Sequence, residues 1–143
     1  MCHRKIVGEY TMIKGIGHLG IFVNNIEESL SALSKIVEFE RPMIKESSEL
    51  GVKVVVVDVG GVELEFIQDY NDNGTLAQMI KKKGDMIHHI CLLTNNIKED
   101  IEIIKQRGVE MKDQKPRVGI RGKKIAMTMP SALKGITIEL SES

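Results

Sequence analysis

An internal repeat limits the possible folds of this chain more than any other feature of its sequence. Thirteen residues starting at Ile16 align with thirteen starting at Ile87, at a constant offset of 71, and six of the pairs are identical. A second pair of segments, starting at Gly61 and Gly135, aligns at an offset of 74. Because repeated sequences form repeated structural units, we expect two copies of one small module.

Each copy has the pattern of a strand, a helix and about three further strands. The β-branched run at the start of each repeat indicates a strand, and Asn25 and Asn96 then stand three residues before a Glu, as helix N-caps do. Each helix should bury one apolar stripe, and Gly108 should end the second helix. The expected stripes are Ile26, Leu30, Leu33 and Val37 in the first copy and Ile97, Ile101 and Ile104 in the second.

The remaining strands follow from alternating apolar runs. We expect strands over 53–59 and 124–129, final strands in the repeated segments 61–66 and 135–140, and a short strand over 41–45. Residues 71–85 should form a linker with a short helix. This predicts an α+β fold in one domain over 13–142, made of a βαβββ module at 13–70 and another at 86–142.

Composition excludes several classes of protein. The 143 residues suit one globular domain, and no apolar run approaches the length of a membrane span. Only two cysteines are present, which favours a reducing cytoplasm. Lys plus Arg equals Asp plus Glu at 20 each, which argues against a nucleic-acid partner, although residues 1–72 sum to −5 and residues 73–143 to +5.

Two histidines and two glutamates recur at matching places in the repeat. His18 and His89 lie on the two first strands, and Glu65 and Glu139 on the two last. On the final strand Ile136, Ile138 and Leu140 should face the helices, while Glu139 faces the other way with Thr137 and Ser141. Two imidazoles and two carboxylates suit a divalent ion such as Zn²⁺, Co²⁺, Ni²⁺ or Mn²⁺. His88 and Glu63 are second choices, because the repeat aligns them with Gly17 and Thr137.

These motifs resemble the vicinal oxygen chelate superfamily, also called the glyoxalase/bleomycin-resistance fold, and most closely its methylmalonyl-CoA epimerase branch. The similarity runs from Ile13 to Glu142 and is carried by four segments: 16–21, 60–65, 86–91 and 134–140. The stretch from Gly119 to Ala126 also resembles an epimerase segment. The resemblance implies two βαβββ modules forming one cup-shaped mixed sheet, with the helices on its outer face. It also implies a homodimer.

The resemblance assigns the same four ligands, His18, Glu65, His89 and Glu139, to the metal. The implied reaction interconverts (R)- and (S)-methylmalonyl-CoA by α-proton abstraction through a metal-stabilised enolate. The resemblance makes Glu139 the base. Since the proton must return on the other face, a second acid is needed, and either Glu65 or a water molecule serves.

A basic stretch in the second half suits the anionic carrier of such a substrate. Six Lys and Arg residues and no acid lie between Lys115 and Lys134. A glycine-bracketed basic loop can hold phosphates, and coenzyme A carries phosphates. We therefore expect Arg121, Lys123 and Lys124 to contact the carrier of an acyl-thioester substrate.

Besides an epimerase, three other functions within this fold remain open, which makes four alternatives in all. A lactoylglutathione lyase like glyoxalase I, acting on the hemithioacetal of methylglyoxal, uses the same kind of His/Glu set. A non-enzymatic member, such as an antibiotic-sequestering protein, is another alternative, although such members usually lack the full ligand set. A ring-cleaving dioxygenase is the fourth, because two His and one Glu suit Fe²⁺.

Overall fold

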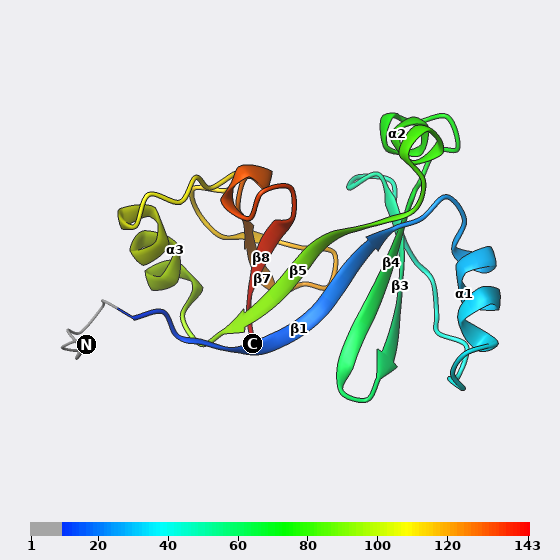
Figure 1. Cartoon of the computed structure of the whole chain (residues 1–143), viewed down its shortest axis with the longest axis horizontal. Coiled ribbons are helices and arrows are strands. Elements are labelled where there is room, and N and C mark those ends of the chain that lie inside the picture. Colours follow the sequence, from blue (N-terminus) through cyan, green and yellow to red (C-terminus); the bar gives the residue numbers. More distant parts are fainter. Residues whose placement is uncertain (1–9) are drawn as a thin grey trace. The chain divides into compact units, whose positions relative to one another are not determined.

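The computed structural model describes residues 10–143. The cytoplasmic location is inferred from the presence of only two cysteines, and one of them, Cys2, lies outside the described residues. Figure 1 shows the elements in chain order. They are β1 (Ile13–Phe22), α1 (Ile26–Ser34), β2 (Lys45–Ser47), β3 (Val52–Val59), β4 (Val62–Asp69), α2 (Thr75–Lys83), β5 (Met86–Thr94), α3 (Ile97–Gln106), β6 (Arg117–Val118), β7 (Lys124–Met127), the 3-10 turn η1 (Pro130–Ala132) and β8 (Thr137–Glu142). The predicted α+β class and the strand, helix, three-strand order of each copy are confirmed, and α2 is the expected linker helix.

The chain divides into two compact units. The central unit comprises residues 18–89, and the terminal unit comprises residues 90–143 with the described residues up to Gly17. Strands β1 and β5 therefore each contribute one part to each unit. The strand order is β2-β3-β4-β1-β5 in the central unit and β1-β5-β8-β7-β6 in the terminal unit.

The central unit buries its apolar residues between α1 and the sheet. Strands β3 and β4 pair antiparallel, whereas β1 and β4 pair parallel with His18 opposite Glu63 and Gly20 opposite Glu65. Ile26 and Leu30 of α1 join a buried cluster with Val23, Val55, Val57 and Phe66. Since Phe66 faces this cluster, its neighbour Glu65 points to the opposite face of β4.

The terminal unit repeats this arrangement with α3. Ile97 and Ile101 of α3 form a buried cluster with Met111, Ala126 and Leu140. Gly108 has φ of 88°, a left-handed conformation that suits glycine after a helix end, so the predicted termination is confirmed. The predicted caps are confirmed too, because the Asn25 and Asn96 side chains accept hydrogen bonds from the amides of Glu28 and Glu99 at 2.9 and 3.1 Å.

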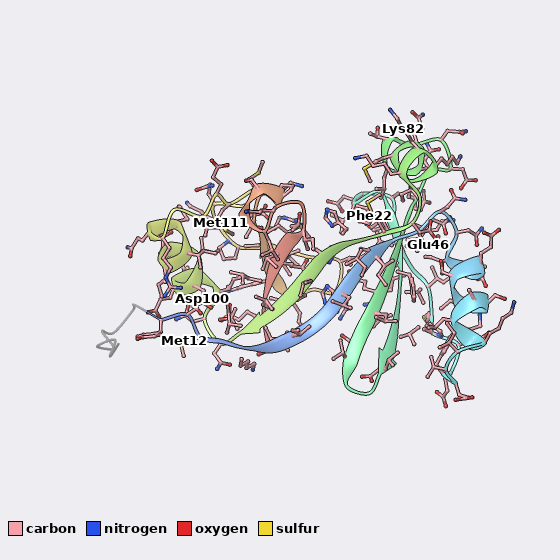
Figure 2. All side chains as sticks on the ribbon, viewed as in Figure 1. Met12, Phe22, Glu46, Lys82, Asp100 and Met111 are labelled. Carbon is pink, nitrogen blue, oxygen red and sulfur yellow. The ribbon has the colours of Figure 1, made fainter. Side chains whose placement is uncertain are left out.

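A buried carboxylate ties α3 to the start of β1. Asp100, fully buried on α3, accepts hydrogen bonds from the Met12 amide at 2.9 Å and from the Thr94 hydroxyl at 2.5 Å. Figure 2 labels Asp100 and Met12. Burying a carboxylate is costly unless donors satisfy its oxygens, and here one donor serves each oxygen.

Three predictions about elements are wrong in detail. The short strand runs over Lys45–Ser47, not 41–45, because Pro42 has no amide hydrogen to donate to a ladder. Val37 does not belong to the stripe of a helix, since α1 ends at Ser34. Ile136 precedes β8 and is 37% exposed, so only Ile138 and Leu140 pack toward α3.

Within residues 10–143, every helix is too short or too polar to cross a bilayer. The cytoplasmic location and the homodimer stay predictions.

Candidate metal centre

Three of the four expected ligands meet inside the central unit. His18 of β1, Glu65 of β4 and His89 of β5 are all buried. The Nε2 atoms of the two histidines are 3.3 Å apart. Glu65 Oε1 lies 3.6 Å from His18 Nε2 and 3.8 Å from His89 Nε2. Strand pairing explains this meeting, because β1 lies between β4 and β5 in the hydrogen-bonded order.

The spacing of these atoms suits a small divalent ion. A triangle with sides of 3.3, 3.6 and 3.8 Å has its centre about 2.1 Å from each corner, which is the usual length of Zn–N and Zn–O bonds. Two facing imidazole nitrogens beside a carboxylate repel one another unless a proton or a cation lies between them. A buried carboxylate also needs a compensating charge or donors. The residues present therefore fit a divalent metal.

A glycine makes room for one of these ligands. A Cβ built at Gly20 of β1 would lie 2.0, 2.2 and 2.4 Å from the Cε1, Nε2 and Nδ1 atoms of His89. Contacts this short do not occur, so a side chain at position 20 and the present His89 ring exclude each other. Gly20 follows His18 by two residues and so shares its face of the strand.

The second nitrogen of His89 also has a neighbour. His89 Nδ1 lies 2.9 Å from Nδ1 of His88, and the two rings meet edge to face at 85°. His88 in turn stacks on Phe22, with ring centroids 4.1 Å apart and an interplanar angle of 13°. Phe22, at the end of β1, is labelled in Figure 2. His88, a second choice as a metal ligand, therefore contacts the expected ligand His89 through the ring nitrogen that does not face His18 and Glu65.

Glu139, the fourth expected residue, lies on β8 of the terminal unit. It is 5% exposed, and its neighbours along the same face, Thr137 and Ser141, are equally buried. Opposite it on β7 is Met127. The expected polar face of the final strand is therefore a buried polar row. Glu63, the other second choice, is half-buried on β4.

The expected phosphate-binding residues lie in or beside the hairpin turn between β6 and β7. Hydrogen bonds from Gly119 N to Lys123 O and from Gly122 N to Gly119 O, both 2.9 Å, close the turn. Arg121 is half-buried, whereas Lys123 and Lys124 are exposed. Arg117, in the same basic stretch, is partly neutralised because its Nε donates to Asp113 Oδ1 at 3.0 Å.

Comparison with known proteins places the chain in a family. The sequence profile of the Glyoxalase/Bleomycin resistance protein/Dioxygenase superfamily matches residues 17–127. The chain belongs to this superfamily. It is 30% identical over 127 residues to the uncharacterized protein YqjC of Bacillus subtilis, covering 89% of this chain and 91% of that protein.

Methylmalonyl-CoA epimerases are among the other proteins that resemble the chain. The chain is 25% identical over 138 residues to mitochondrial methylmalonyl-CoA epimerase of Dictyostelium discoideum, covering 96% of this chain and 82% of that protein. A variant of methylmalonyl-CoA epimerase from Streptomyces coelicolor, in complex with 2-nitronate-propionyl-CoA, superposes with a TM-score of 0.80 at 23% identity. That match covers 92% of this chain and 98% of the other and shows a shared fold.

Two features of the site were missed by reasoning from the repeat. Gly20 aligns with Cys91 and His88 with Gly17, so neither stands out as a matched pair. Strand alternation carried the missing signal for Gly20, since a glycine two residues beyond a candidate ligand leaves space on the ligand face. Nothing in the sequence indicated that His88 Nδ1 contacts His89, because neighbouring strand residues normally point to opposite faces.

Proposed function

We propose that this chain is a metal-dependent epimerase that interconverts (R)- and (S)-methylmalonyl-CoA. The observation that supports this most is the convergence of His18, Glu65 and His89 within bonding distance of one small ion. The similarity to epimerases, one of them solved with an acyl-CoA analogue, supports the choice of substrate.

The fourth ligand in this proposal is Glu139. Its support is the repeat, which aligns Glu139 on β8 with Glu65 on β4, together with its burial in a strand otherwise lined by polar side chains on that face. A divalent ion held by these residues would act as a Lewis acid on the thioester carbonyl oxygen and acidify the neighbouring C–H bond.

The proposed reaction needs one proton-transfer group on each face of the reacting carbon. We assign the base to Glu139, whose carboxylate takes the proton from the carbon between the thioester and the carboxylate groups. Glu65, or a water molecule, returns a proton to the opposite face of that carbon. The reaction exchanges only this hydrogen, so no electrons are transferred and no other bond is broken.

The basic turn between β6 and β7 would hold the coenzyme A phosphates. Lys123 and Lys124 are exposed beside Arg121, and no acidic residue lies in this stretch. Replacing both lysines with glutamine should raise the KM for the CoA ester, more at low than at high salt, and leave kcat within about twofold because phosphate contacts are remote from the reacting carbon. An unchanged KM would remove these residues from the site.

Deuterium exchange provides the test of the activity. Metal-loaded protein, given one epimer of methylmalonyl-CoA in D₂O, should add one mass unit to the substrate and produce the other epimer. His18→Ala and Glu139→Ala should lose both bound metal and exchange. Glu63→Gln is the matched control on β4, expected to keep its metal.

Three results would contradict the proposal. One is absence of exchange in protein that carries its metal, above all if it turns over methylglyoxal with glutathione instead. Full metal occupancy in both alanine variants would overturn the ligand set. Loss of metal in Glu63→Gln but not in Glu65→Gln would move the β4 ligand to Glu63.

A further inference from the structure

We propose that His88 is a positioning residue that fixes the tautomer and ring orientation of His89 so that His89 Nε2 is free of a proton and can bind the metal. This rests on the metal site proposed above and adds a residue to it. The two Nδ1 atoms lie 2.9 Å apart, within hydrogen-bond distance. One of them must therefore donate and the other accept.

The surroundings of the two rings determine the direction of this hydrogen bond. His89 Nε2 faces His18 Nε2 and Glu65 Oε1, so a metal-binding His89 must carry its proton on Nδ1. His89 Nδ1–H then donates to His88 Nδ1, and His88 carries its own proton on Nε2. Metal-bound histidines commonly donate their second N–H to a neighbouring acceptor, which fixes the tautomer and the ring orientation.

His88 is itself held in place by packing. Its ring stacks on Phe22 at 4.1 Å, and it meets His89 at an angle of 85°. Gly20 lies close on another side of the His89 ring, since a Cβ there would come within 2.4 Å of three ring atoms. The His89 ring is thus confined by the main chain of β1 and oriented by His88.

Two substitutions at position 88 separate hydrogen bonding from packing. His88→Asn keeps an acceptor, because the Oδ1 atom of asparagine stands at the same distance along the side chain as Nδ1 of histidine, but it loses the stacking. His88→Phe keeps an aromatic ring against Phe22 but has no acceptor. If His88 acts through the hydrogen bond, His88→Phe should weaken Zn²⁺ binding more than His88→Asn does. If His88 acts through packing, His88→Asn should weaken it more.

Two measurements on the full chain read out the effect. Long-range ¹H–¹⁵N spectra of histidine-labelled, metal-free protein should show His89 as the Nδ1–H tautomer in wild type and in His88→Asn, and not in His88→Phe. The Kd for Zn²⁺, measured by competition with a chelator, should rise ten- to hundredfold in His88→Phe and only a few-fold in His88→Asn.

The proposal is overturned if wild-type His89 is the Nε2–H tautomer, if His88→Phe binds Zn²⁺ as tightly as wild type, or if His88→Asn binds more weakly than His88→Phe. Wild-type protein that binds no Zn²⁺ overturns it as well. Deuterium exchange distinguishes the two proposals. If His88→Phe binds Zn²⁺ more weakly than His88→Asn, as expected, but the Zn²⁺-loaded wild type shows no exchange, only the epimerase activity is contradicted.

Discussion

Replacing Gly20 with alanine should destroy the metal site while leaving the fold intact. The new Cβ would lie 2.0 Å from His89 Cε1, whereas ordinary contacts start at 3.4 Å, so the ring must move by about 1.4 Å. A metal–nitrogen bond tolerates about 0.2 Å, and His89 would therefore cease to be a ligand. Gly20 does not have a positive φ, so alanine brings no backbone strain of its own.

The loss of one ligand has a measurable thermodynamic effect. Metal at 100 times its Kd stabilises the wild-type fold by about 2.7 kcal/mol, which is roughly 5–10 °C in Tm for a domain of this size. If Kd rises by a factor of 100, the same metal concentration contributes only about 0.4 kcal/mol, or roughly 1–2 °C.

Thermal denaturation with and without Zn²⁺ measures this difference, and chelator competition gives Kd directly. Gly15→Ala is the matched control, because Gly15 lies on the same strand and a Cβ there meets no atom within 4 Å. We expect Gly15→Ala to keep the full metal-dependent rise in Tm. A Gly20→Ala variant with wild-type affinity for Zn²⁺ would refute the placement of the His89 ring over Gly20.

Three further predictions concern stability. Asp100→Ala should lower the free energy of unfolding in urea by about 2–4 kcal/mol, because the buried Thr94 hydroxyl and the part-buried Met12 amide lose their acceptor; a loss below 1 kcal/mol would contradict this role. Asn96→Ala should cost about 1 kcal/mol through loss of the α3 cap, with no change in metal affinity, and a neutral result would argue against the cap. The hydrogen bond from Arg41 lowers the pKa of Glu27 from 4.5, so this pair stabilises the fold above pH 4.5 and the stabilisation disappears as pH falls through the lowered pKa. Arg41→Gln should return the Glu27 pKa, followed by NMR, toward 4.5, and an unshifted titration would disprove the pairing.

Much of the fold follows from local sequence signals. The repeat predicts the βαβββ order, because a pattern of apolar periodicity, N-cap and glycine acts over a few residues wherever it occurs. The caps at Asn25 and Asn96 and the termination at Gly108 are of this kind. The strand predicted at 41–45 failed where local patterning is weakest, beside Pro42 at the edge of the sheet.

Part of the candidate site could likewise be predicted from the sequence, and part depends on tertiary structure. The sequence alone singled out His18, Glu65 and His89, since matched positions in a repeat are visible without coordinates. That these three side chains lie close together depends on strand order. The parallel pairing of β1 with β4 sets Gly20 opposite Glu65, although the two residues are distant in sequence. The close approach of the His89 ring to Gly20 and the contact between His88 and His89 depend on ring orientations in the packed protein. The types of ligand were therefore determined locally, while their orientation was decided by tertiary packing, which no local pattern of residues encodes.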